Sequence, residues 1–94
     1  MSDLTSQMVI RSSYEPVGGI WIGVIKTGAA VTDDTFCIND PTYGHPGANR
    51  IWWATINGTA NHTAVNCDLG GTSKVTVGTG NITDGEMLVI ATAE

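Results

Sequence analysis

Charged residues are scarce in this chain of 94 residues: they make up 14% of it, against roughly 25% in an average soluble domain. Four basic residues against nine acidic ones give a net charge of −5. A nucleic-acid-binding protein needs several cations to displace counterions from phosphates, so this composition argues against nucleic acid as a partner. The surface must be covered mainly by Thr, Asn, Ser and Gly, which are cheap to desolvate. We therefore expect a subunit that associates with other subunits rather than a free monomer.

Long apolar runs are absent as well. No stretch approaches the ~18–20 apolar residues of a membrane span, and the first residues have neither the cations nor the apolar run of a secretory signal. We expect no membrane partner. We also expect a protein made in the cytoplasm that stays there, or leaves the cell by lysis or a dedicated route.

Helical periodicity is missing, and Val, Ile and Thr, which favour strands, dominate the chain. The short spacing between apolar segments leaves no room for crossover helices, so we predict an all-β fold, a small antiparallel β-sandwich or barrel of about six or seven short strands. Residues 8–94 would form this single β domain. The polar stretch 1–7 shows no strand pattern, and we expect either a frayed terminus or an extended arm that orders against a partner. The predicted strands are Met8–Tyr14, Gly19–Lys26, Thr35–Asn39, Arg50–Ile56, Thr63–Cys67, Lys74–Val77 and Glu86–Thr92.

Two stretches of the sequence, 27–34 and 79–86, resemble each other, since each carries Thr-Gly, a β-branched residue and Thr-Asp before a further strand. Asp in such a place fixes a turn by bonding the backbone two residues on. Both stretches are predicted as turns. Recurrent turn chemistry is the favoured explanation of the likeness, and a duplicated strand–loop–strand unit is the alternative.

Only two cysteines occur, Cys37 and Cys67, each within a predicted strand. Two readings remain open, a pair of buried thiols and a disulfide that closes the loop between them. Synthesis in a reducing compartment favours the thiols.

Residue patterns that carry catalytic or metal-binding chemistry are absent. Structural zinc needs paired ligands two to four residues apart, and Cys37, His45, His62 and Cys67 are not spaced in this way. No nucleophile elbow and no phosphate-binding loop followed by a helix is present. We therefore expect a protein that is not an enzyme, with no catalytic residues, no cofactor and no metal.

Three tryptophans are a heavy load for a small chain, and Trp is enriched at binding hot spots. Trp52 and Trp53 are adjacent on one predicted strand, so alternation predicts one ring in the core and the other facing a partner or ligand. The longest irregular connection, residues 40–49, is a second candidate contact region. The candidate interface residues are Trp52, Trp53 and Trp21, the arm residues Met1, Ser2, Asp3, Leu4 and Thr5, and the loop residues Tyr43 and His45.

The polar arm, the Thr/Gly/Val-rich strands, the low charge and the closing segment Gly80–Ile90 (GNITDGEMLVI) together resemble small capsid decoration, or cement, proteins of tailed bacteriophages. The resemblance implies a β-sandwich or barrel, often trimeric, that sits on the outer capsid lattice and reinforces it. The major capsid protein would then be the partner, the virion surface the location, and the N-terminal arm a contact that reaches across the lattice. It implies no active site.

Two other functions fit the same sequence. A small carbohydrate-binding or adhesive domain would stack exposed Trp rings on sugars and bond hydroxyls with Asn and Asp in its turns. Another virion or filament subunit, such as a minor capsid, fibre or tail component, would share the low charge and the β-rich pattern.

Overall fold

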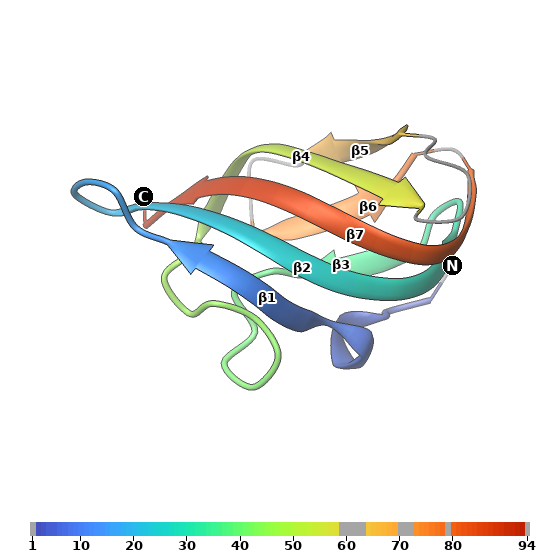
Figure 1. Ribbon diagram of the computed structural model, residues 1–94, viewed down its shortest axis with the longest axis horizontal. Coiled ribbons are helices and arrows are strands. Elements are labelled where there is room, and N and C mark those ends of the chain that lie inside the picture. The colour runs from blue at the N-terminus through green and yellow to red at the C-terminus, as the bar shows by residue number, and fades with distance from the viewer. Residues whose placement is uncertain (1, 59–63, 70–72, 79, 94) are drawn as a thin grey trace.

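The computed structural model describes residues 2–58, 64–69, 73–78 and 80–93 and confirms the all-β prediction (Figure 1). Its only described helical element is the 3-10 turn η1 (Thr5–Gln7). No helix in the described ranges is long and apolar enough to cross a bilayer. The strands are β1 (Val9–Tyr14), β2 (Ile20–Val31), β3 (Thr35–Cys37), β4 (Arg50–Gly58), β5 (Ala64–Leu69), β6 (Lys74–Val77) and β7 (Asn81–Thr92).

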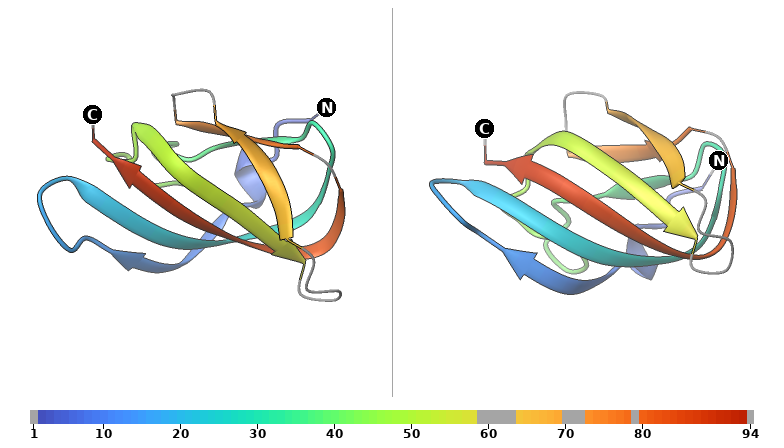
Figure 2. Two further views of the ribbon diagram at one scale, coloured as in Figure 1. Left: turned by 90° about the horizontal axis from the view of Figure 1, so that it is seen from above. Right: turned by 45° about the horizontal axis from the view of Figure 1, so that its top comes forward.

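The strands form one continuous antiparallel ladder in the order β1-β2-β7-β4-β5-β6-β3. β5 belongs to two sheets, because its first half pairs with β4 and its second half with β6 (Figure 2). The main sheet is therefore β1-β2-β7-β4, and β6 and β3 fold over its inner side. The result is a partly closed barrel within the predicted class.

The N-terminal segment completes the barrel wall. Asp3 bridges Thr35 of β3 in parallel, with a hydrogen bond from the Leu4 N–H to the Thr35 carbonyl (2.8 Å) and one from the Thr35 N–H to the Ser2 carbonyl (2.8 Å). Leu4 packs against the core and Thr5 is buried. Residues 2–7 are therefore neither frayed nor extended away from the subunit. Leu4, the one apolar side chain among these six residues, is partly removed from water by packing on the core.

The strand bounds agree with the prediction within about two residues, except where β2 and β7 continue past it. β2 extends to Val31 and β7 begins at Asn81, so residues 27–31 and 81–86 of the two stretches predicted as turns are strand, and the turn of the first stretch begins only at Thr32. They pair with each other, with Ala30 opposite Ile82, through register shifts on either side of Gly28. The β-bulges accommodate turn-forming residues such as Gly28 within the strands, which is why these residues were predicted as turns.

The core lies between the main sheet and β3 and β6. Alternate residues of each strand point inward, and the largest is Trp21, which is 1% exposed. Its indole lies over Gly23, where a Cβ atom would overlap the ring. The buried apolar residues are Met8, Trp21, Ile25, Ala30, Phe36, Ile38, Ala48, Ile51, Ala54, Ile56, Val75, Val77, Ile82, Met87, Val89 and Ala91.

Candidate interaction face

The outer side of the main sheet carries two cross-strand rows without a charged residue. Residues paired across antiparallel strands share a face, so each row runs from β1 through β2 and β7 to β4. We call these two rows, with Trp52 beside them, the Trp face. The first row is Tyr14, Ile22, Ile90 and Trp53, and the second is Ser12, Val24, Leu88 and Thr55.

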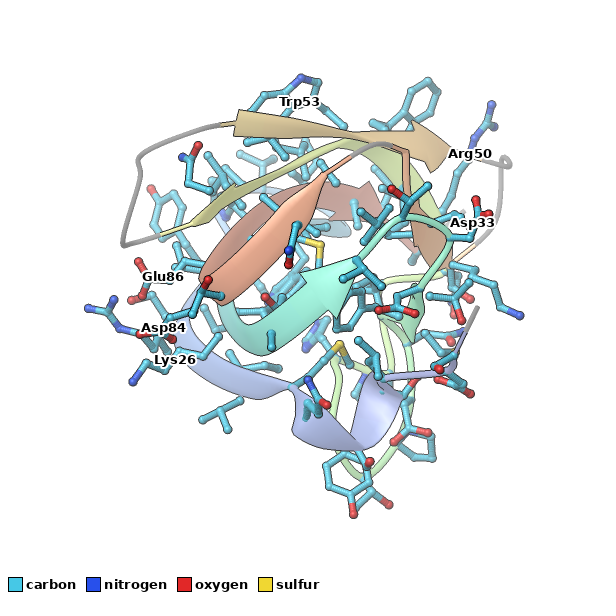
Figure 3. All side chains as sticks on the ribbon, turned by 90° about the vertical axis from the view of Figure 1, so that its right-hand side faces the viewer. Lys26, Asp33, Arg50, Trp53, Asp84 and Glu86 are labelled. Carbon is cyan, nitrogen blue, oxygen red and sulfur yellow. The ribbon has the colours of Figure 1, made fainter. Side chains whose placement is uncertain are left out.

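Trp52 and Trp53 lie on the same side of β4, which corrects the expectation that one ring enters the core. Ile51 pairs with Ala91 and Trp53 with Ile90, so Trp52 is the extra residue of a β-bulge. A bulge sets two residues opposite one and breaks the alternation of faces. Trp52 is 52% exposed and Trp53 44% exposed, and Figure 3 shows Trp53 projecting away from the barrel.

Trp52 is held in place by two neighbours. Its indole N–H donates to the hydroxyl of Thr92 (2.8 Å), and the guanidinium of Arg50 lies 4.2 Å from its ring centroid. A cation over an indole is an attractive contact that also covers one face of the ring. Trp52 is therefore held by its neighbours at one edge of the Trp face. Among the described residues, no ring stacking and no cation–π contact involves Trp53.

Charged residues border the Trp face next to its second row. Lys26 of β2 is paired in register with Glu86 of β7, and Glu86 forms an ion pair with Arg11 of β1. Figure 3 shows Asp84 beside Lys26 and Glu86. With Arg50, this side of the barrel holds three of the chain's four basic residues. The Trp face is thus apolar in its centre and nearly neutral at its border in a protein that is acidic elsewhere.

Trp21 and His45, both candidate interface residues, are internal contacts instead. The His45 ring stacks on Trp21 with centroids 4.7 Å apart and planes 7° from parallel. Its Nε2 lies 3.1 Å from a carboxylate oxygen of Glu15, and the Trp21 indole N–H donates to the Ser13 hydroxyl (2.6 Å). The 40–49 loop therefore packs on the core through His45, whose ring is used in a contact within the subunit.

Tyr43 of the same loop is 42% exposed, and its backbone N–H donates to Asp40 (2.8 Å). It lies on the loop and not on the outer side of the main sheet, so it does not join the Trp face. Met1 lies outside the described residues.

The arm residues expected as contacts hold the first turn together. The Asp3 carboxylate accepts hydrogen bonds from the Thr5 hydroxyl and from the Thr5 N–H, which lower the pKa of Asp3 from its ordinary 3.8. The Thr5 hydroxyl in turn accepts from the Cys37 N–H (3.0 Å), and the Ser2 N–H donates to Asp34 (3.0 Å). These polar groups are used inside the subunit.

The two cysteines cannot form the disulfide. β6 separates their strands, with Cys37 opposite Lys74 and Cys67 opposite Val77. Two strand spacings and three residues of rise place their Cα atoms more than about 10 Å apart, whereas a disulfide needs less than about 7 Å. Cys37 is a free thiol that is only half-buried and donates to Asn39 (3.1 Å), so its predicted full burial is also wrong. The side chain of Cys67 lies outside the described residues.

Clefts in the described part of the molecule are small or featureless. One, about 180 Å³, lies between Glu15, Trp21 and His45. Another, about 340 Å³, is lined by Gly18, Gly19, Thr92 and Ala93 and has no charged side chain. Small-molecule sites usually enclose ~300–1,000 Å³ with convergent polar groups. No group of three or more His, Cys, Asp or Glu side chains able to hold a metal occurs among the described residues, and His62 lies outside them.

Comparison with known proteins adds no identification. The chain matches no protein-family model, no curated protein and no solved structure. The Trp face itself must carry the functional argument.

The sequence analysis missed most of the Trp face, although a signal for it was present. The segments Ile20–Ile25 and Met87–Ile90 are apolar without polar alternation. In an antiparallel sheet with one wet side, alternation is the usual pattern, so its absence indicates that both sides are apolar.

Proposed function

We propose that this protein is a non-enzymatic structural subunit of a virion, which decorates and reinforces the outer surface of a viral capsid through subunit–subunit contacts. The observation that carries the proposal is the Trp face, two uncharged rows across the main sheet of a small acidic domain. Contiguous apolar surface of this kind marks interaction sites in soluble proteins. Its partners would be the major capsid protein and further copies of the chain.

The remaining side chains support a structural role. Asp3, Asp34 and Asp40 accept hydrogen bonds from backbone N–H groups two or three residues away and so fix turns. Glu86 pairs with Arg11. Catalysis by acid–base groups instead requires side chains that converge on a cleft able to hold substrate. The charged groups of this protein support a rigid barrel whose outer side is free for contact.

The proposal is tested on the virus whose genome carries this gene. Mass spectrometry of purified virions should find the chain in a fixed ratio to the major capsid protein. Capsids assembled without it should release their DNA at a lower temperature, and adding the purified protein should restore the wild-type release temperature. Absence of the chain from virions, or no change in the release temperature, would refute the proposal.

Carbohydrate binding is the second candidate, because adjacent exposed Trp rings can stack on sugars. It is less well supported, since Arg50 covers one side of Trp52 and Thr92 takes its indole N–H. Affinity electrophoresis in gels containing polysaccharides separates the two functions. Retention that is lost in Trp53→Ala would favour the glycan, and unchanged migration would leave the virion role. A role in a fibre or tail would place the chain in virions at a ratio that does not follow the capsid protein.

A further inference from the structure

We propose that two copies of this chain pair face to face through their Trp faces, about a twofold axis that runs along the strands between β2 and β7. The inference deepens the proposed function by naming a partner for the Trp face, and it rests on that function only for its biological purpose.

The first row reads aromatic, isoleucine, isoleucine, aromatic from β1 to β4. A twofold axis between β2 and β7 sets β1 of one copy opposite β4 of the other. Tyr14 then lies opposite Trp53, and Ile22 lies opposite Ile90. In a twofold contact residue i meets j while j meets i, so a row with this palindromic order matches itself.

The second row has the same symmetry in different chemistry. It reads hydroxyl, aliphatic, aliphatic, hydroxyl, so that Ser12 would face Thr55 and Val24 would face Leu88. Hydroxyl groups opposite each other can hydrogen-bond, and the aliphatic pair excludes water at the centre. One twofold axis therefore places complementary residues opposite each other in both rows.

The charged residues at the border of the Trp face are also complementary about this axis. Lys26 lies on β2 and Glu86 on β7, in one row. The same axis places the Lys26 ammonium of each copy opposite the Glu86 carboxylate of the other. Because Glu86 already pairs with Arg11 of its own copy, each cross-copy contact would place its carboxylate between two cations. This charge complementarity favours a second copy over a partner with an unrelated surface.

The shape of the sheet also fits. Stacked sheets lie about 10 Å apart with strands roughly aligned, and two copies of one sheet share the same twist. The barrel makes the outer side convex, so the gap widens from β2 and β7 toward the flanks (Figure 2). The largest side chains, Tyr14 and Trp53, occupy those flanks and are 63% and 44% exposed.

The area buried by this contact is small, so we expect a weak dimer. Four strands and three rows cover on the order of 400 Å² of each copy. Twice that area is below the ~1,200 Å² of standard stable interfaces, so the pair should be weak, with a dissociation constant of roughly 10 µM to 1 mM. A trimer, which the family resemblance implies, joins different surfaces of each copy and does not use this palindrome.

The first test is sedimentation velocity of the purified full chain from about 10 µM to about 1 mM. The wild type should shift from monomer to dimer over this range. Ile90→Glu, at the centre of the Trp face, should raise the dissociation constant at least about tenfold. Val31→Glu, a matched change at an exposed apolar residue outside the Trp face, should leave it unchanged, and circular dichroism melts of both variants check folding.

The second test uses the charged border and leaves the apolar rows intact. K26E and E86K should each dimerise less than the wild type, because each sets like charges opposite each other. A mixture of K26E and E86K should form heterodimers at least about tenfold more tightly than either variant alone, because both cross-copy pairs are then restored. A mixture of K74E and E86K is the control, since Lys74 lies on β6 away from the Trp face, and it should gain nothing comparable.

Several outcomes would contradict the proposed dimer. A wild type that stays monomeric throughout, a trimer, a dimer unaffected by Ile90→Glu, or equal pairing in the two mixtures would overturn it. A monomer that binds capsids in an Ile90-dependent way would also overturn the pairing while leaving the proposed function intact. A dimer that passes both tests but is absent from virions would keep the pairing and refute the virion role.

Discussion

Tryptophan is buried on the inner side of the main sheet and exposed on the outer side. On the inner side, Trp21 is covered by Gly23 below, His45 above and Ser13 at its indole N–H. On the outer side, Trp53 is 44% exposed, against 1% for Trp21. The same residue type thus contributes to the core in one place and to a contact surface in another, and the side of the strand decides which.

The largest effect should follow from removing the inner ring. Trp21→Ala should lower the free energy of unfolding by about 3–5 kcal/mol, because it leaves a cavity under the 40–49 loop and an imidazole without its stacking partner. Urea denaturation followed by circular dichroism measures this change. A loss below about 1 kcal/mol would contradict the assignment of Trp21 to the core.

The next largest effect concerns the glycine beneath that ring. Gly23→Ala should destabilise the fold by about 1–3 kcal/mol, because the new methyl group overlaps the Trp21 indole and the ring must shift. Gly23 does not have a positive φ, so its loss should come from the overlap with the ring and not from backbone strain. In a Trp21→Ala background, where the ring is absent, Gly23→Ala should cost much less, and an equal loss in both backgrounds would show that packing on Trp21 is not the cause.

On the outer side the effect should be small. Trp53→Ala should change the free energy of unfolding by less than about 1 kcal/mol, since its ring fills no cavity. Trp52→Ala should cost slightly more, because Arg50 and Thr92 lose a partner. The same denaturation experiment ranks the three tryptophans, and a Trp53 variant as unstable as Trp21→Ala would remove the contrast between the two sides.

The smallest effect lies beside β3. Hydrogen bonds from Thr5 lower the pKa of Asp3, so its ionised form stabilises the folded state above the ordinary pKa of 3.8. That contribution is lost as the pH falls through the lowered folded-state pKa. Melting temperatures of wild type and Asp3→Asn should therefore differ at pH 7 and converge toward pH 2. A difference that stays constant over this range would show that the carboxylate is not the cause.

Strand positions could be predicted well from the sequence, because β-branched runs and turn residues act locally. The bounds of Lys74–Val77 agree at both ends, and most others agree within about two residues. The continuation of β2 and β7 was not predictable in this way. Turn-forming residues there, such as Gly28 and Asp84, are held in bulged strands by pairing with residues far away in the chain.

The candidate site was predicted only in part. The Trp pair was found from its composition, but its orientation was wrong, because a bulge at Trp52 depends on the register between β4 and β7. His45 was predicted as an interface residue, because nothing local to its loop reveals that its ring stacks on Trp21. Local patterns predict elements, whereas faces and stacking depend on pairing between distant segments.

The position of β7 has a consequence for biosynthesis. This strand follows every other strand in chain order, yet it lies between β2 and β4 at the centre of the main sheet. Until it emerges from the ribosome, the backbone groups of both neighbours on the inward edges lack partners, and the nascent chain exposes apolar strands with open edges. Folding of the main sheet is therefore expected to be slow, since it waits for this long-range pairing. A premature stop codon before Asn81 would leave a product that chaperones hold or proteases degrade, rather than a smaller barrel.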